Sequence, residues 1–288
     1  MPELPEVETI KTDLEKYILN KKITNIVVKK PKMIDGNYLS FKKFLINNRI
    51  TKISRRGKLL IFHLTNNKYL LTHLKMTGQL IYKDKNKITP GGHEFPNINP
   101  EDLPNKYSHI IIYFKDESKL FFNDMRQFGY MKIVNQENLN KKIKEFGVEP
   151  LDKKWTVDYL TNILKNKNTS LKAVLLNQKH IAGLGNIYVD EACFLSKIKP
   201  DRVASSLTKE EIKKLHKACK DILLKAIKYR GTTFSSFRDS NGSPGNFSKF
   251  LNVYQKEGTV CKICEQDHIH RIKKVAGRST HYCPYCQK

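Results

Sequence analysis

The chain opens with Met1-Pro-Glu-Leu-Pro-Glu-Val-Glu8, and apolar residues then recur at helical spacing over 7–18. Pro5 suits the first turn of a helix, since its fixed φ is already helical and its missing N–H has no intrahelical partner there. Glu6 and Glu8 complement the positive end of the helix dipole. The stretch therefore predicts an N-terminal helix, on which the rest of the first half is expected to pack.

The same stretch carries a candidate nucleophile. Met1 precedes the small residue Pro2, so removal of the initiator methionine would expose a secondary amine. Such an amine can attack an aldehyde-like sugar carbon and form an iminium ion, whose fixed positive charge withdraws electrons from the attacked carbon. Glu3 lies beside this amine and can donate a proton to the sugar or to its leaving group.

Composition points to a polyanionic partner. The 288 residues include 53 basic and 28 acidic side chains, which gives a formal net charge of +25. A biased genome composition also enriches Lys and Asn, but it would not suppress Asp and Glu. Nucleic acid is therefore the expected partner. We find no leader peptide and no apolar run of about 18 residues, so we expect a cytoplasmic protein with reduced or metal-bound cysteines.

Length favours two domains, and the pattern changes between the halves. In the first half, β-branched or alternating segments predict strands at 23–28, 50–54, 59–64, 69–74, 110–114 and 120–122. Hairpin turns are expected at 65–68 and 115–118, and a short helical piece at 41–46. Residues 82–106 have no periodicity and predict a long exposed loop. An antiparallel sandwich or flattened barrel follows.

The second half has helical periodicity. Helices are predicted at 157–164, 170–177 and 187–195, and Thr208-Lys-Glu-Glu211 is a capping box that starts another. Its apolar stripe includes Cys219, and both this cysteine and Cys193 are expected to be inert core thiols.

Ile181-Ala-Gly-Leu-Gly-Asn-Ile-Tyr188 places two glycines before a helix. Gly183 and Gly185 permit tight turns, and Asn186 is a good N-cap. A glycine turn that leads into a helix N-terminus is an anion site, because its free N–H groups and the helix dipole favour negative charge. A tight helix–helix corner is the alternative.

Two CxxC motifs, Cys261-Lys-Ile-Cys264 and Cys283-Pro-Tyr-Cys286, lie 18 residues apart. This spacing is a strong zinc signal, and four protein ligands leave no open position, so the ion is expected to be structural. The alternative, a pair of disulfides, is disfavoured because the cytoplasm, the expected compartment, keeps thiols reduced. Three histidines lie nearby, namely His268, His270 and His281, and one of them could replace a cysteine. Four thiolates are the simpler set of ligands.

The N-terminal block, the run IAGLGNIYVDE over 181–191 and the paired CxxC motifs resemble the bacterial, zinc-finger-containing formamidopyrimidine-DNA glycosylases, nearly end to end and in the same order. The resemblance implies a multidomain α+β fold. An N-terminal antiparallel β-sandwich with flanking helices would precede a helical, helix–two-turns–helix domain with a C-terminal β-hairpin zinc finger. We expect the catalytic β-sandwich at 1–148, a hinge at 149–153, the helical domain at 154–250 with a lesion-capping loop near 232–249, and the zinc finger at 251–288.

This resemblance implies base-excision repair of oxidised purines, chiefly 8-oxoguanine and formamidopyrimidines, in double-stranded DNA. The enzyme would be an N-glycosylase and an abasic-site β,δ-lyase that acts as a monomer, with one structural Zn²⁺ and no membrane partner. The implied catalytic residues are Pro2, Glu3, Lys58 and Arg278. The implied DNA-binding residues are His73, Met76, Tyr107, Arg126, Phe128, Lys167 and Asn186.

Within that set, the resemblance implies that Met76, Arg126 and Phe128 fill the gap left by the flipped nucleotide, with Arg126 and Phe128 on one side of an extended segment. Tyr107 departs from the family, which usually has His there. Two alternatives remain. One is an endonuclease VIII-like glycosylase for oxidised pyrimidines, although that group starts without Leu4 in this position; the other is a catalytically inactive zinc-ribbon DNA-binding protein.

Overall fold

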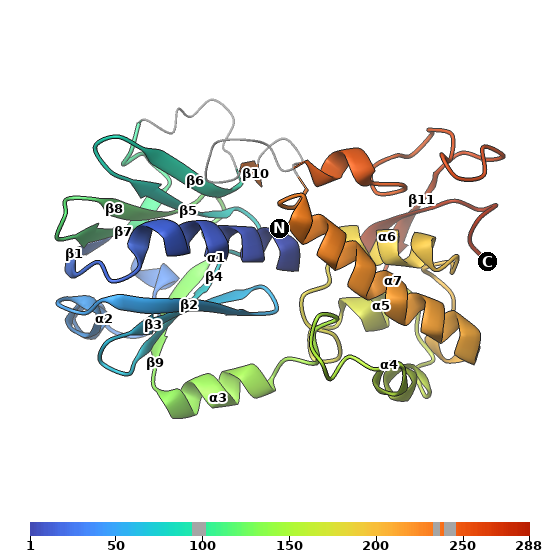
Figure 1. Ribbon diagram of the computed structural model, residues 1–288, viewed down its shortest axis with the longest axis horizontal. Coiled ribbons are helices and arrows are strands. Elements are labelled where there is room, and N and C mark those ends of the chain that lie inside the picture. The colour runs from blue at the N-terminus through green and yellow to red at the C-terminus, as the bar shows by residue number, and fades with distance from the viewer. Residues whose placement is uncertain (94–101, 233–236, 239–245) are drawn as a thin grey trace. The chain divides into compact units, whose positions relative to one another are not determined.

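The computed structural model describes residues 1–93, 102–232, 237–238 and 246–288. The chain forms two compact units (Figure 1). The first unit comprises Met1–Lys144 and Tyr229–Ser248, and the second comprises Glu145–Lys228 and Lys249–Lys288. Each unit has its own secondary structure and is described separately.

The first unit contains two antiparallel sheets. Their strands are β1 (Ile23–Val28), β2 (Ile50–Arg56), β3 (Leu59–Leu64), β4 (Tyr69–His73), β5 (Gly78–Lys83), β6 (Ile88–His93), β7 (Ser108–Phe114), β8 (Lys119–Asp124), β9 (Tyr130–Val134) and β10 (Phe237–Arg238). One sheet has the order β1-β7-β8-β5-β6-β10 and the other the order β2-β3-β4-β9. The short helices are η1 (Pro31–Met33), α2 (Tyr38–Leu45) and α3 (Gln136–Lys144). The predicted hairpins β3–β4 and β7–β8 are confirmed.

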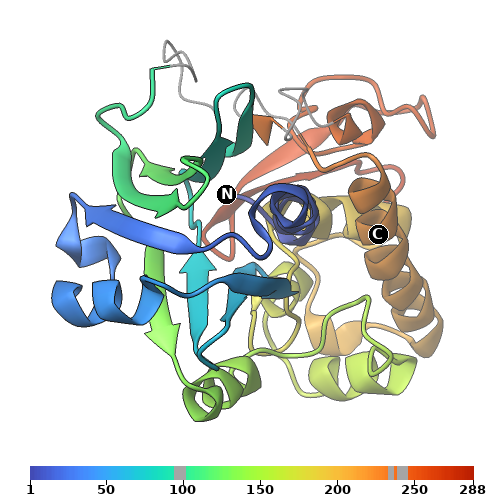
Figure 2. The ribbon, with the colours of Figure 1, turned by 60° about the vertical axis from the view of Figure 1, so that its left-hand side comes forward.

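Helix α1 (Leu4–Ile18) joins the two sheets into one core. Its apolar side chains Val7, Ile10 and Leu14 are at most 2% exposed. They belong to the same buried cluster as Phe62 of one sheet and Phe122 of the other. Figure 2 looks nearly along α1 and shows it between the sheets. The predicted sandwich with an N-terminal helix is therefore confirmed, because the amphipathic helix covers the apolar faces of both sheets.

The expectation of a long exposed loop over 82–106 was wrong for its first part. Tyr82 is 1% exposed and pairs with Thr89 across the hairpin of β5 and β6. The turn is closed by the Asp84 carboxylate, which accepts N–H bonds from Asn86 (2.9 Å) and Lys87 (2.8 Å). Strand β6 contains Pro and two Gly, so its sequence has weak strand propensity. Pairing with β5 and β10 overrides that propensity.

The segment Tyr229–Ser248 lies in the first unit, whereas the sequence grouped it with the helical domain over 154–250. The buried Glu6 carboxylate of α1 accepts bonds from the N–H (2.8 Å) and hydroxyl (3.1 Å) of Thr232. Arg230 forms an ion pair with Asp13 of α1 at 2.5 Å. A buried carboxylate must be satisfied, so these bonds hold the segment to α1. Most of the predicted lesion-capping loop, namely 233–236 and 239–245, lies outside the described residues.

The second unit is built from helices and one hairpin. These elements are α4 (Val157–Leu164), α5 (Leu171–Leu176), α6 (Asn186–Leu195), η2 (Ala204–Ser206), α7 (Lys209–Lys228), β11 (His270–Val275) and β12 (Arg278–Tyr282), with η3 (Phe247–Phe250) at the chain boundary between the units. The capping box is confirmed, since Thr208 and Glu211 exchange bonds of 2.8 and 3.3 Å. Cys193 and Cys219 are fully buried, and burial raises the pKa of Cys219 to about 12. Both are inert core thiols, as predicted.

The segment that the sequence set apart as a zinc finger, 251–288, shares this second unit with the helices. Phe194 of α6 packs in one buried cluster with Val253, Ile269 and two of the cysteines. The Glu191 carboxylate accepts the backbone N–H groups of residues 252–254 at 2.9–3.0 Å. The side chain of Gln287 joins the Cys283 N–H to the Ile198 carbonyl. Within the described residues, no helix is both long and apolar enough to cross a membrane.

Candidate active site and metal centre

The residues that precede α1 are held in place rather than frayed. Pro2 is buried and Glu3, the N-cap of α1, is 3% exposed, whereas Met1 is 44% exposed. The Glu3 N–H donates to the carboxylate of Glu6 at 2.9 Å, which is half of a capping box. Because Glu6 is also bonded to Thr232, the start of the chain is fixed to a segment far away in sequence.

The chain's terminal amine, here on Met1, lies among charged groups. Burial lowers its pKa below the ordinary value, and the positive charges of Lys58 and Arg126 lower it further. The carboxylates of Glu3 and Glu6 act in the opposite direction, but they do not reverse the shift. A lowered pKa increases the neutral, nucleophilic fraction of an amine near neutral pH.

Lys58 occupies the tight hairpin between β2 and β3 and is 5% exposed. Gly57 has φ +57°, a left-handed conformation that glycine adopts without cost. The Arg55 guanidinium donates to the Gly57 carbonyl at 2.9 Å and to the Glu8 carboxylate of α1 at 2.9 Å. Arg55 therefore ties the hairpin tip, and Lys58 with it, to the helix that begins beside the terminal amine.

Met76, Arg126 and Phe128 come together at the surface, from the loops that follow β4 and β8. Arg126 donates to the Met76 sulfur at 3.3 Å, and its guanidinium lies 4.8 Å from the centre of the Phe128 ring. Phe128 is 55% exposed and Met76 is 36% exposed, which is unusual for large apolar side chains. The expected extended segment was wrong, because Gln127 has φ +55°. This turn, rather than strand alternation, places Arg126 and Phe128 on one side.

The residue that shapes this loop, Asp124, was not among the predicted site residues. The fully buried Asp124 carboxylate accepts the N–H groups of Arg126 (3.1 Å) and Gly129 (2.7 Å) and the hydroxyl of Thr77. Its backbone carbonyl accepts a bond from the buried His109 ring at 2.9 Å. Aspartate side chains often accept the backbone N–H two residues further on, so an aspartate at the end of a predicted strand was the available signal.

We predict that Asp124→Asn destabilises the protein by about 2–3 kcal/mol, because one carboxylate oxygen becomes an NH₂ group that faces backbone donors. Urea unfolding monitored by far-UV circular dichroism measures the change. Asp35→Asn is the matched control, since Asp35 pairs with Lys132 on an exposed surface. If the two variants lost equal stability, the Asp124 contacts would have no special role.

Two further candidates flank the same loops. His73 accepts the Lys75 N–H on Nδ1 at 3.0 Å, and burial lowers its pKa to about 3. The ring is therefore neutral at pH 7, and its other nitrogen carries the proton as a donor. Tyr107 is half-buried, and its carbonyl accepts the Asp124 N–H at 3.1 Å.

In the second unit, the expected N-cap role of Asn186 was wrong. Gly185 is the N-cap and Asn186 is the first helical residue. The Asn186 amide donates to the Ser279 carbonyl at 3.1 Å, and its own oxygen is buried with no hydrogen-bond partner among the described residues. Lys167 is half-buried in the turn between α4 and α5. Burial lowers the pKa of His180, and the positive charge of Lys167 lowers it further.

A buried ion pair anchors the hairpin that carries Arg278. Lys172 and Asp190 are both 0% exposed and lie 2.6 Å apart. Lys172 also donates to the Ser279 carbonyl at 3.0 Å, and Asp190 accepts the His281 N–H at 2.9 Å. Strand β12 is thus fixed to α5 and α6, while Arg278 at its start is exposed.

We predict that Lys172→Met costs about 3–5 kcal/mol, because it leaves the Asp190 carboxylate buried without its cation. The double variant Lys172→Met/Asp190→Asn should recover part of the loss, since the unpaired charge is then removed. Thermal or urea unfolding tests both variants against Lys165→Met, an exposed lysine of the same unit. A double variant less stable than Lys172→Met would contradict this explanation.

The four cysteines near the C-terminus form one cluster. Their sulfur atoms all lie within 4.8 Å of one another, with 3.9 Å between Cys261 and Cys286 and 3.7 Å between Cys264 and Cys283. Disulfides need sulfur atoms about 2.05 Å apart, so that alternative is excluded. Zn–S bonds of about 2.3 Å in a tetrahedron place sulfur atoms about 3.8 Å apart, which this cluster fits. No histidine of the described chain joins the group.

Comparison with known proteins agrees with this architecture. The family model of the formamidopyrimidine-DNA glycosylase N-terminal domain matches residues 1–131, and that of the H2TH domain matches residues 146–238. The formamidopyrimidine-DNA glycosylase of Pelotomaculum thermopropionicum is 42% identical over 100% of this chain and 99% of its own length. That of Listeria monocytogenes is 38% identical over the whole of both chains.

Solved structures of the Lactococcus lactis enzyme match over 100% of both chains. A complex with an abasic-site-containing DNA has 34% identity and a TM-score of 0.86. A complex with an N7-benzyl-Fapy-dG-containing DNA has 35% identity and a TM-score of 0.87. The fold and the matched domains define a DNA glycosylase, an enzyme that removes damaged bases from DNA. Within that class, the chain belongs to the formamidopyrimidine-DNA glycosylase family.

Proposed function

We propose that this glycosylase excises oxidised purines, chiefly 8-oxoguanine and formamidopyrimidines, from duplex DNA and then nicks the strand as a β,δ-lyase. The observation that carries the proposal is the start of the chain: Pro2 is buried, and burial together with the charges of Lys58 and Arg126 lowers the pKa of the terminal amine. The Lactococcus lactis relative binds Fapy-dG-containing and abasic-site-containing DNA in its solved complexes, which supports the same substrate class here.

In this mechanism, removal of Met1 makes the nitrogen of the buried Pro2 the terminal amine. Its lone pair attacks C1′ of the sugar, the C1′–N bond to the base breaks, and Glu3 protonates the ring oxygen as the sugar opens. The product is a cationic Schiff base, which has no N–H to lose and acidifies the C2′ hydrogen. Lys58 and Arg278 assist the two eliminations, which release the phosphates on either side. Every proton and electron pair is supplied by the DNA, the protein or water.

The remaining site residues would hold the DNA. Met76, Arg126 and Phe128 form an exposed apolar and cationic tip that suits the gap left by a flipped nucleotide. His73, with its proton on the outer ring nitrogen, and Asn186 can donate to phosphates. Tyr107 and Lys167 are further phosphate contacts from their respective units. We also propose that 149–153 acts as a hinge.

The cysteine cluster is proposed to hold one structural Zn²⁺, because four thiolates at tetrahedral separations leave no coordination position for a reacting molecule. One chain supplies every proposed site residue, so a monomer suffices. A substrate of bacterial genomic DNA implies action in the cytoplasm.

Borohydride trapping tests the proposal. A duplex with 8-oxoguanine opposite cytosine should give a covalent protein–DNA cross-link, because borohydride reduces only the Schiff base. A duplex of the same sequence with an oxidised pyrimidine in place of the 8-oxoguanine should give far less of this cross-link. Faster excision of the pyrimidine would favour the endonuclease VIII-like alternative, and tight binding without any cross-link would favour the inactive DNA-binding alternative.

We predict that duplex affinity falls steeply with salt, by about 10³-fold over a fourfold rise in concentration if six or more phosphate contacts form. The net charge of +25 is the reason, since each neutralised phosphate releases counterions on binding. Fluorescence anisotropy between 50 and 200 mM salt would measure the slope. A nearly flat plot would mean that the basic residues do not face the DNA.

A further inference from the structure

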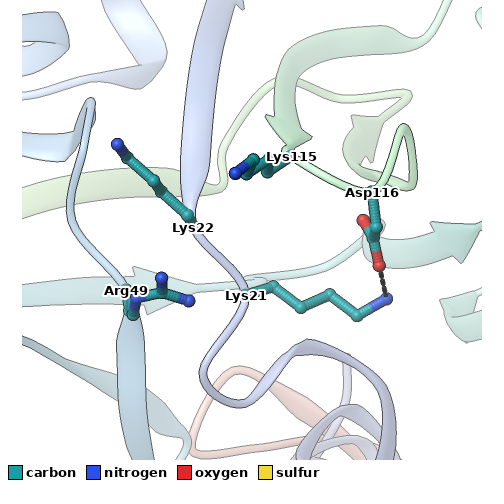
Figure 3. A pocket seen from close by; sticks show the side chains of 5 residues that line it. All are labelled: Lys21, Lys22, Arg49, Lys115 and Asp116. Carbon is teal, nitrogen blue, oxygen red and sulfur yellow. Dashed lines mark ion pairs between the residues drawn. The ribbon is translucent and has the colours of Figure 1, made fainter.

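The first unit has a second polar site, at the end of α1 opposite to Pro2. It is a pocket of about 360 Å³, and it is lined by Lys21, Lys22, Arg49, Lys115 and Asp116 (Figure 3). Helix α1 has 15 residues, so at 1.5 Å per residue about 22 Å of helix separates this pocket from the terminal amine. None of the residues assigned to catalysis or DNA binding lines it.

The backbone fixes three cationic residues from distant parts of the chain side by side. After α1, Asn20 adopts φ +61° and reverses the chain, which brings Lys22 into an antiparallel bridge with Arg49. The Lys115 N–H, in the turn between β7 and β8, donates to the Lys22 carbonyl at 2.8 Å. Backbone hydrogen bonds and a bridge therefore fix these three positions next to the ends of strands.

The charges in the pocket are unbalanced. Asp116 is neutralised by Lys21, whose ammonium lies 2.5 Å from the carboxylate and 2.6 Å from the Tyr82 hydroxyl. In Figure 3, Lys21 extends to Asp116, whereas Lys115 extends toward Lys22.

Within the described chain, no carboxylate pairs with Lys22, Lys115 or Arg49. The Arg49 guanidinium makes a single bond, to the Asn20 carbonyl at 2.6 Å, and keeps its other N–H groups for a ligand. Three like charges fixed around one opening repel one another, and a bound anion would relieve that repulsion.

We propose that this pocket binds a phosphate-bearing anion, carried either by a free phosphate compound or by a nucleic-acid backbone. Arginine offers a planar fork of donors that matches two phosphate oxygens, and lysine acts as a point charge for the others. Two ammonium groups and one guanidinium suit a multiply charged group better than a single carboxylate. The site is independent of the excision chemistry, since it uses none of the proposed catalytic residues.

Isothermal titration of the full-length protein with inorganic pyrophosphate at low salt tests the site. Wild type should bind with saturation, and Lys22→Ala/Lys115→Ala should bind about 10–100-fold more weakly, since two charge-assisted contacts are lost. The matched control Lys43→Ala/Lys144→Ala removes the same charge from exposed lysines of α2 and α3 and should bind within about twofold of wild type. Lys22→Arg/Lys115→Arg should restore binding.

The proposal fails if wild type shows no saturable binding of pyrophosphate, or if the control loses as much affinity as the pocket variant. Either result is separable from excision, because no lesion is used. An undamaged duplex then identifies the source of the phosphate. If duplex affinity depends less steeply on salt in the pocket variant than in the control, the pocket binds the nucleic-acid backbone. If this dependence is unchanged while pyrophosphate binding is lost, the pocket binds a free phosphate compound.

Discussion

Pro2→Gly is expected to slow base release by on the order of 10⁴-fold or more, the size of loss seen when a catalytic nucleophile is removed. Glycine also leaves an amine at the start of the chain, but a primary one. The imine formed by this amine can lose the N–H proton and with it the positive charge that drives elimination. Glycine also lacks the ring that fixes φ at this position. Base release and borohydride cross-linking on an 8-oxoguanine duplex measure the change, while anisotropy should show that binding is retained.

The matched control is Pro5→Ala, in the first turn of the same helix. Alanine is a good helix former, so this variant should keep base release within about tenfold of wild type. Intact-mass measurement of each preparation must accompany the assay, because the mechanism requires that Met1 is absent. Full nicking activity in a preparation that retains Met1 would refute Pro2 as the nucleophile.

Cys283→Ala is expected to abolish metal binding and to unfold the C-terminal part of the second unit. The binding free energy of a structural zinc is also folding free energy, with apparent values of about 10–16 kcal/mol. Cys283 is 0% exposed and packs with Phe194 of α6, so the loss should extend to the helix. Zinc content by mass spectrometry should fall from one ion per chain to none, and limited proteolysis should cut within 251–288. Prolonged chelation of wild type should reproduce both effects.

Cys219→Ala is the matched control, since this cysteine is equally buried but lies on α7, outside the cluster. It should keep one zinc per chain and lose only the small stability of a shortened core side chain. The role given to the cluster would be excluded if Cys283→Ala still bound one zinc and kept the protease resistance of wild type.

Local patterns predicted much of the secondary structure. Strands 23–28 and 59–64 and helix 157–164 have the predicted bounds, because each is a short apolar pattern closed by turn or capping residues. The strand β6 was missed because Pro and Gly hide its pairing, which depends on β5 and β10 rather than on its own propensity.

The candidate site divides in the same way. The start of the chain and the cysteine pairs were singled out from residue type and spacing, and Lys58 from the family resemblance. The residues that hold them were not. Glu6 and Lys172 are charged side chains buried against partners far away in the sequence, and Asp124 is buried under the loop that its own carboxylate holds. In sequence, a buried charge is indistinguishable from the solvated charge that most such residues carry.

By itself, the sequence determined the family, the apolar periodicities and the four-thiolate donor set, because each depends on residues close together in the chain. Only the tertiary structure decided that 229–248 belongs with the first unit, and that three basic residues share one pocket beyond the end of α1. Thr232 and Glu6 are 226 residues apart when they bond. Such contacts arise when a buried carboxylate must find donors wherever the packed chain supplies them, and local spacing carries no information about that choice.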